Sequence, residues 1–348
     1  MTETSTATQA YLPSPYAAER RFAVEAVASA ARLTKAVRDD FDPQAESVSK
    51  ADSSPVTVAD LGAQALVRMA MAEALPEDGM LGEEDFGQLA ESPELAQAVL
   101  AHVRAQRPEV TLDDLREALD SCDDPAGPDR RWWTLDPVDG TKGFLRNEQY
   151  AIALALVEDG EVKVAAMGCP NLPYRGEPGH PSVDGPVGVL FVAERGRGTR
   201  MMPLFEATAD RAGEPVRAAA PTTTAPARSA EWVEAAHSDQ SEAARIGAAL
   251  GITAEPVRLD SQTKYAMVAR GDASIYLRVP RGDYRENIWD HAAGMLVVEE
   301  AGGRVSDVEG KPFDITTGQR MTKNRGAVVT AASIHDEVVA AVRSVLEG

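Results

Sequence analysis

Apolar side chains recur every three to four residues near the start of the chain. Within the segment 16–37 they stand at Phe22, Ala26, Ala30, Leu33 and Val37. Because an α-helix completes a turn in 3.6 residues, this spacing puts them on one face and predicts an amphipathic helix. A second helical run, 63–74, is expected just after Asp60.

Strands are expected in the middle of the chain. The apolar runs 150–157 and 162–167 flank the short segment Glu158-Asp-Gly-Glu161. Two such runs around an Asp-Gly turn predict an antiparallel hairpin. The apolar run 187–193 predicts a further strand.

Two changes of composition divide the chain. Residues 91–120 have the pattern of two acidic helices, 93–106 and 112–119, to which no chemistry can be assigned. Residues 218–227 hold two prolines and three threonines and predict a linker. A chain of 348 residues with 44% hydrophobic content is long enough for two domains. We expect a disordered tail at 1–15, a metal-binding α+β domain at 16–217 and a substrate-recognition α/β domain at 228–348.

The formal net charge of −20 limits the partners of the chain. Proteins usually meet a nucleic-acid backbone with clustered lysine and arginine, so this charge argues against a nucleic-acid polymer. A small phosphate ester remains compatible, since bound metal ions invert the local sign of an acidic pocket.

Nothing in the sequence predicts a membrane-bound or secreted protein. No run approaches the ~18 apolar residues that span a bilayer. The first eight residues are polar and lack the basic and apolar regions of a secretory signal. The two cysteines, Cys122 and Cys169, are too few for a disulfide framework. We therefore expect a cytoplasmic monomer with reduced thiols.

The segment Asp136-Pro-Val-Asp-Gly-Thr141 holds the chemistry of a metal-phosphate site. Asp136 and Asp139 offer the hard oxygen ligands that Mg²⁺ prefers, and Pro137 fixes one backbone dihedral between them. The side chain of Val138 is expected to be a buried anchor, which leaves its carbonyl oxygen as a third ligand. A helix beginning at Gly140 and Thr141 would offer backbone N–H groups to an anion. Taken alone, the segment fits a turn between strands equally well.

Three other segments add to this motif. Gly82-Glu83-Glu84 supplies two carboxylates, and Asp290 lies at the expected start of a helix that ends at Gly302-Gly303. The segment 54–60 ends in Asp60. Each has a plain structural explanation, as a solvated acidic pair or a helix cap, but their combination favours a metal site.

In this order, the segments resemble the motifs of a known superfamily. They are Ser54-Pro-Val-Thr-Val-Ala-Asp60, Gly82-Glu-Glu84, Asp136-Pro-Val-Asp-Gly-Thr141 and Trp289-Asp-His-Ala-Ala-Gly294. The chain is thereby similar to the Mg²⁺-dependent, lithium-sensitive phosphatases that include inositol monophosphatase. The runs 133–146, 168–172, 259–265 and 276–280 resemble, within that superfamily, the 3′(2′),5′-bisphosphate nucleotidases of the yeast and plant type. The resemblance implies a layered αβαβα sandwich with two subdomains.

The resemblance also implies roles for the carboxylates. Glu83, Asp136 and the Val138 carbonyl would hold one Mg²⁺, and Asp136, Asp139 and Asp290 a second, with Asp60 touching a third through water. Two divalent ions can clamp a phosphate and acidify a bound water. We assign activation of that water to Thr141 and Asp60, with the threonine hydroxyl donating to the carboxylate.

The nucleotide pocket of the family maps onto the second half of the chain. The positions that match it are His237, Ser238, Asp260, Ser261, Lys264 and Arg278, together with Gly140, Thr141 and Asp290. Lys264 and Arg278 are expected to pair with the phosphate that is not cleaved. The segment around His237 departs from the longer Gly-His-Ser pattern of the resembled enzymes. The five histidines of the chain show no zinc-ligand spacing.

The expected activity is the removal of the 3′-phosphate of adenosine 3′,5′-bisphosphate, and of 3′-phosphoadenylyl sulfate, with two or three Mg²⁺ ions as cofactors. One alternative keeps the site and changes the substrate to an inositol phosphate, as in inositol monophosphatase or inositol polyphosphate 1-phosphatase. Another is a nucleotide sensor without catalysis. The complete set of carboxylates argues against the sensor.

Overall fold

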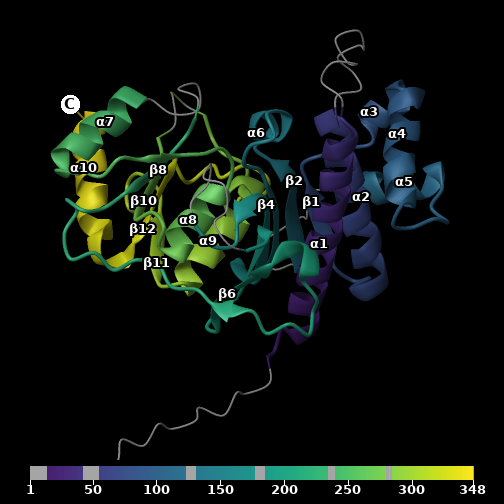
Figure 1. The fold of residues 1–348 in the computed structure, drawn as a ribbon, viewed down its shortest axis with the longest axis horizontal. Helices are drawn as coiled ribbons and strands as arrows, with labels where there is room; N and C mark the ends of the chain where they lie inside the picture. Colours follow the sequence, from purple (N-terminus) through teal and green to yellow (C-terminus); the bar gives the residue numbers. More distant parts are fainter. Residues whose placement is uncertain are drawn as a thin grey trace, which may run out of the picture.

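The computed structural model describes residues 14–41, 55–122, 131–176, 185–233, 240–279, 282 and 284–347. Five layers follow one another across the molecule: helices, a sheet, helices, a second sheet and helices (Figure 1). The predicted αβαβα sandwich is confirmed. Most of the predicted tail, residues 1–13, lies outside the described residues.

The first helical layer is formed by α1 (Ala17–Asp40) and α2 (Pro55–Ala74). The predicted apolar stripe of α1 is buried at all five positions. The start predicted for the second helix is wrong, because α2 already begins at Pro55 and Asp60 lies within it. A proline is compatible with a first helical turn, where its missing N–H would have no partner.

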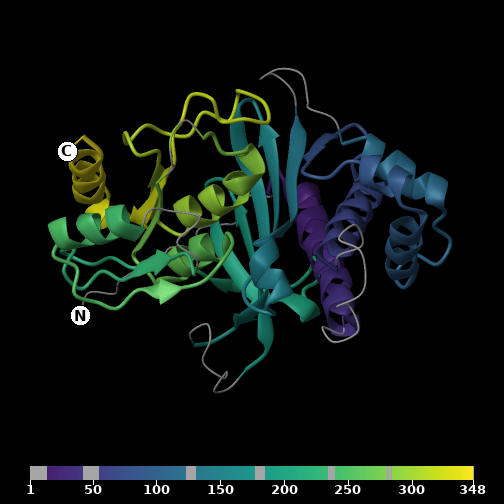
Figure 2. The ribbon, with the colours of Figure 1, turned by 90° about the horizontal axis from the view of Figure 1, so that it is seen from above.

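The acidic segment between residues 87 and 120 folds as three short helices. They are α3 (Gly87–Glu91), α4 (Pro93–Arg104) and α5 (Leu112–Asp120). The two helices predicted here are therefore present. Figure 2 shows them at one end of the molecule, on the far side of α1 and α2 from the second sheet.

The larger sheet has seven strands in chain order. They are β1 (Gly79–Gly82), β2 (Trp132–Asp139), β3 (Ala151–Glu158), β4 (Glu161–Pro173), β5 (Val187–Glu194), β6 (Gly198–Pro203) and β7 (Glu214–Pro215). Among the described strands of this sheet, only the β1–β2 pair is parallel. The predicted hairpin is confirmed as β3 and β4, joined by a turn in which Asp159 and Gly160 both have positive φ.

The two faces of β3 carry side chains of different size. Ile152, Leu154 and Leu156 pack in the cluster formed with α1 and α2. The residues on the other face are Ala151, Ala153 and Ala155. They belong to the apolar cluster that includes α9 (Ala292–Glu300). Because strand side chains alternate between faces, the small side of β3 lets α9 approach closely. That helix begins two residues after Asp290.

The second sheet has five strands in the order β11-β12-β10-β8-β9. Their bounds are β8 (Ser229–Glu231), β9 (Val257–Arg258), β10 (Ile275–Arg278), β11 (Gly303–Ser306) and β12 (Ala327–Ala331). Helices α8 (Thr263–Arg270) and α9 lie between the sheets, and α7 (Gln240–Ala249) and α10 (His335–Glu347) cover the outer face (Figure 1). The chain changes sheet between β7 and β8, where the linker is expected; the domain boundaries themselves stay a prediction.

Short 3₁₀ turns are present at Leu204–Glu206, Ile288–Asp290 (η4) and Ala332–Ile334. Among the described residues, no helix combines the length and apolar character that crossing a membrane requires.

Candidate active site

A β-bulge in β2 brings two carboxylates to the same side of the sheet. Asp136 lies opposite Ala153 of β3 and Asp139 opposite Ala151, so the two residues between them on β2 face only one residue on β3. In a regular strand, residues three apart point to opposite faces, and one extra residue corrects that parity. Pro137 falls inside the bulge, where the absence of an N–H is tolerated.

A third carboxylate reaches this place from the second half of the chain. Oxygen atoms of Asp136, Asp139 and Asp290 all lie within 4.8 Å of one another. Asp290 closes the 3₁₀ turn η4, and its Oδ2 accepts a hydrogen bond of 2.9 Å from the Asn287 backbone N–H. The prediction that Asp290 caps α9 is therefore wrong, because the residue before that helix is His291. The turn aims Asp290 at the bulge.

The carboxylates repel one another strongly. Burial, followed by the charges of Glu83, Asp139 and Asp290, raises the pKa of Asp136 well above its usual value. Burial and Asp290 raise the pKa of Asp139 to about 6, against the opposing effect of Lys264. Such shifts mean that burial and mutual repulsion outweigh the positive charge that the protein supplies near these groups.

Glu83 stands at the rim of the cluster. The residue as a whole is exposed, but its carboxyl group lies against that of Asp136. Loss of water around this group, with the charges of Glu84, Asp290 and Asp139, raises its pKa to about 7. Asp60 is buried on α2; burial and then Glu84 and Glu83 raise its pKa well above the usual value. The structure thus gathers all five predicted carboxylates into one electrostatically linked group.

Thr141 opens the short helix α6 (Thr141–Leu145), which begins where a helix start is expected. Helix α6 lies against α2, the helix of Asp60. In the described chain the Thr141 hydroxyl and the Asp60 carboxylate form no direct hydrogen bond, so their predicted pairing stays a prediction. Val138 is buried in the apolar cluster beneath the sheet, as expected of an anchor.

The segment 260–262 closes over the end of β2. The Gln262 N–H donates a short hydrogen bond to Asp139, and Arg146, just after α6, forms a short ion pair with Asp260. Ser261 adopts φ +69° and its hydroxyl donates to Thr263 at 2.8 Å. Asp260 and Ser261 are both buried and engaged within the protein, and their predicted contact with substrate stays a prediction.

Lys264 and Arg278 lie behind the cluster. The Lys264 side chain is 0% exposed, and burial lowers its pKa to about 7 although Asp139 and Asp260 favour its charged form. Arg278 lies 3.5 Å from an oxygen of Asp290 and 3.6 Å from one of Glu286. Burial alone would lower the pKa of Arg278, but Asp290, Tyr276 and Glu286 raise it. His237 and Ser238 lie outside the described residues.

Comparison with known proteins decides the family. A model of the inositol monophosphatase family matches residues 18–347. The chain belongs to the inositol monophosphatase family. It is 41% identical to a 3′(2′),5′-bisphosphate nucleotidase of Emericella nidulans, over 95% of this chain and 99% of the relative. It is 40% identical to the enzyme of the same name in Schizosaccharomyces pombe, over 94% of this chain and 96% of the relative.

Solved structures of the inositol monophosphatase family have the same fold. An inositol monophosphatase from Zymomonas mobilis aligns with a TM-score of 0.61 at 19% identity, covering 95% of this chain and 99% of that one. The inositol monophosphatase from Anabaena aligns with a TM-score of 0.59 at 18% identity, covering 93% and 94%. These values support the layered architecture.

The carboxylate cluster of this family member fits a hard divalent cation. Its donors are carboxylate oxygens, the ligand type that suits Mg²⁺. The Oδ1 atom of Asp136 is buried and has no hydrogen-bond partner in the described structure. A buried acceptor without a partner is costly, and a cation among these oxygens would satisfy it.

Gln64 is a site residue that sequence reasoning does not single out. Its amide accepts a 3.0 Å hydrogen bond from the Glu84 N–H and donates one of 2.5 Å to the Glu84 carbonyl. Gln64 is fully buried and stands one helical turn after Asp60 on α2. It therefore ties the loop of Glu83 to the helix of Asp60. The sequence does carry a signal for Gln64, since Asp60 and Gln64 are the only polar residues between positions 58 and 67.

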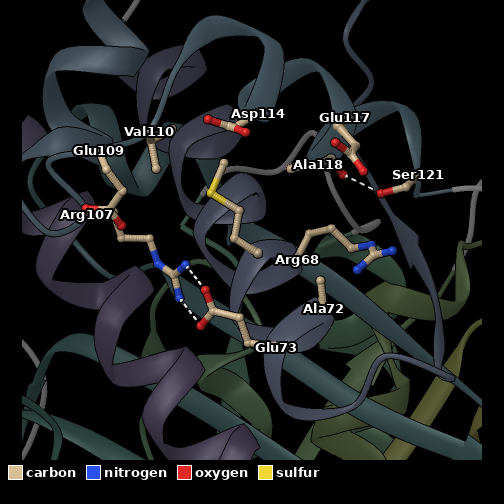
Figure 3. Close-up of a pocket in the computed structure, with 11 residues that line it drawn as sticks. Arg68, Ala72, Glu73, Arg107, Glu109, Val110, Asp114, Glu117, Ala118 and Ser121 are labelled. Atoms are coloured by element: carbon tan, nitrogen blue, oxygen red, sulfur yellow. Dashed lines mark hydrogen bonds and ion pairs between the residues drawn. The ribbon is translucent and has the colours of Figure 1, made fainter.

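A separate pocket of about 380 Å³ lies between α2 and the helical insert (Figure 3). Arg107 and Glu73 form a two-pronged ion pair there, at 2.6 and 2.9 Å. Arg68, Glu109, Asp114 and Glu117 also line it. No predicted site residue of this family member is among its lining residues.

Proposed function

We propose that this chain is a Mg²⁺-dependent phosphomonoesterase that converts adenosine 3′,5′-bisphosphate to AMP and phosphate. The observation that carries the proposal is the cluster of Asp136, Asp139 and Asp290, assembled by the bulge in β2. Relatives about 40% identical over nearly the whole chain bear the name of this activity. The sulfated analogue, 3′-phosphoadenylyl sulfate, is the second substrate of the proposal.

Five carboxylates and one carbonyl would hold the metal. Glu83, Asp136 and the Val138 carbonyl would bind one Mg²⁺, and Asp136, Asp139 and Asp290 another, with Asp60 near a third. The bound ions would neutralise phosphate charge and acidify a water. The raised pKa values of Asp136 and Asp139 support these roles, since a bound cation would stabilise the ionised form of both.

Thr141 and Asp60 would accept a proton from the attacking water. Thr141 starts α6, and its hydroxyl would donate to the buried Asp60 carboxylate while accepting a hydrogen bond from the attacking water. Gly140 has φ +93°, and its backbone would approach the scissile phosphate where a side chain could not.

The uncleaved phosphate would meet the cationic side chains behind the cluster. Lys264 and Arg278 are the two cations that the structure places next to Asp139 and Asp290. Asp260, Ser261, His237 and Ser238 complete the proposed nucleotide side. An arginine held by two carboxylates is preorganised for charge-assisted binding of a phosphate.

Initial rates of phosphate release on a substrate panel, at one Mg²⁺ concentration, test the proposal. The panel holds adenosine 3′,5′-bisphosphate, 3′-phosphoadenylyl sulfate, inositol 1-phosphate and inositol 1,4-bisphosphate. We expect kcat/KM for the adenosine bisphosphate to exceed that for either inositol phosphate by at least about 100-fold, which corresponds to ~2.7 kcal/mol in the transition state. Preference for an inositol phosphate would refute the substrate assignment, and no release from any of them would refute the enzyme.

A further inference from the structure

Trp232 lies against both cations of the proposed phosphate pocket. It follows the last residue of β8, and the centroid of its ring is 3.2 Å from the Lys264 Nζ atom. The Arg278 guanidinium carbon lies 5.9 Å from the same ring centroid. One indole thus covers two positive charges, as in a cation–π contact.

The ammonium of Lys264 is closed off on every side. Its one hydrogen bond in the described structure goes to the Leu259 carbonyl, at 3.2 Å. Tyr276 stands 5.4 Å from Nζ on another side. No carboxylate of the described chain forms an ion pair with this group, and the whole residue is 0% exposed. A phosphate can therefore reach Lys264 only if a neighbour moves.

Of these three neighbours, Trp232 lies nearest the surface. Tyr276 belongs to β10 and packs edge-on against Tyr265 within the second apolar cluster. The Leu259 carbonyl is part of the backbone beside β9. Trp232 is 8% exposed, against 2% for both Tyr276 and Leu259, so it is the neighbour most open to an entering ligand.

We infer that Trp232 is a specificity-determining gate, which the uncleaved phosphate of a bisphosphate displaces from Lys264. This inference rests on the proposed function. A substrate with a second phosphate exchanges the cation–π contact for an ion pair with Lys264, whereas a substrate with one phosphate has no group to place there. The indole therefore weakens the binding of every anion at Lys264 and leaves the scissile phosphate unaffected.

Kinetics on two matched substrates test the gate. Wild type, Trp232→Ala and Trp232→Phe are compared on adenosine 3′,5′-bisphosphate and on adenosine 3′-monophosphate, which lacks the uncleaved phosphate. We expect Trp232→Ala to lower KM for the bisphosphate by roughly 5- to 30-fold, the range of a desolvated cation–π contact, with kcat within about twofold. Both kcat and KM for the monophosphate should stay within about twofold of wild type. Because Trp232→Phe keeps a ring, its KM for the bisphosphate should fall between those of wild type and Trp232→Ala. With Lys264→Met as the background, adding Trp232→Ala should no longer lower KM for the bisphosphate.

Calorimetric titration with AMP, which keeps the uncleaved 5′-phosphate, gives a readout that needs no turnover. The gate predicts tighter binding of AMP to Trp232→Ala than to wild type. A higher KM or weaker AMP binding in Trp232→Ala would overturn the inference, as would equal changes on both substrates. If wild type releases no phosphate from either substrate, the proposed function fails, while the AMP titration still decides the gate. Trp232→Phe supplies the same comparison if the alanine variant does not fold.

Discussion

The backbone N–H of Gln262 donates a hydrogen bond to the carboxylate of Asp139. Asp139 ends a strand of the seven-stranded sheet, and Gln262 precedes α8, the helix that carries Lys264. This contact joins the proposed metal site to the proposed phosphate pocket. A disturbance at the junction should therefore affect both metal binding and substrate binding.

Gly140→Ala should damage this junction. Gly140 has φ +93°, and an added Cβ would lie 2.6 Å from the Cβ of Ser261, so the segment 260–262 would have to shift. We expect the free energy of unfolding to fall by more than the ~1–2 kcal/mol that a left-handed backbone alone costs. Turnover should fall at least about 100-fold, because the displaced groups hold Asp139. Urea unfolding and steady-state kinetics measure the two effects.

Gly196→Ala is the matched control. Gly196 has φ +78°, but an added Cβ would meet nothing within 4 Å. This variant should lose about 1–2 kcal/mol of stability and keep its activity. Equal activity loss in both variants would mean that the contact with Ser261 has no special role.

Asp136→Asn should abolish activity while stabilising the metal-free protein. The substitution removes a charge from a buried group whose neighbours repel it, so the melting temperature in EDTA should rise. Turnover should fall at least about 100-fold, because the amide is a poor ligand for Mg²⁺. Asp113→Asn on the exposed side of α5 should change neither quantity. An unchanged or lower melting temperature in EDTA would contradict the inferred repulsion between Asp136 and its neighbouring carboxylates.

The stabilisation by Mg²⁺ should grow with pH. Unfolded aspartate and glutamate titrate near pH ~4, whereas the folded pKa is about 6 for Asp139 and about 7 for Glu83. Between these values the folded state binds more protons than the unfolded state, so the metal-free protein loses stability as pH rises from about 4 to 7. Mg²⁺ competes with those protons. The rise in melting temperature on adding Mg²⁺ should be small at pH 5 and large at pH 8. Equal rises at both pH values would contradict the assignment of Asp139 and Glu83 as metal ligands.

Gln64→Leu should weaken metal binding. The loop that carries Glu83 would lose both hydrogen bonds that tie the Glu84 backbone to α2. Removal of such a supporting contact typically lowers metal affinity by about 10- to 100-fold, which Mg²⁺ titration of activity would show as a higher half-saturating concentration. Gln106→Leu is the control, since Gln106 makes a similar double hydrogen bond to Ser29 away from the site. It should lower stability without changing the Mg²⁺ requirement.

Local patterns predicted much of the secondary structure. The stripe of α1 and the Asp159-Gly160 turn between β3 and β4 depend on residues close in sequence, so spacing and turn chemistry suffice to predict them. The candidate metal-binding carboxylates lie in short sequence motifs, each of which spans only a few residues. The αβαβα arrangement followed from the resemblance and not from these patterns.

Relationships between distant segments could not be predicted. The bulge that aligns Asp136 with Asp139 is a property of the β2–β3 register, which only the paired sheet defines. The approach of Asp290 to Asp136 and Asp139 joins residues more than 150 positions apart along the chain. Burial of Lys264 beneath Trp232 joins two residues 32 positions apart, and no local pattern marks it.

Phosphorus NMR of adenosine 3′,5′-bisphosphate with the purified protein tests the central claim most directly. With Mg²⁺ present, the account predicts loss of the 3′-phosphate resonance, growth of inorganic phosphate and persistence of a 5′-phosphate resonance at the AMP position. With EDTA in place of Mg²⁺, the spectrum should not change. Loss of the 5′-phosphate, or release at an equal rate in EDTA, would contradict a metal-dependent 3′-phosphatase.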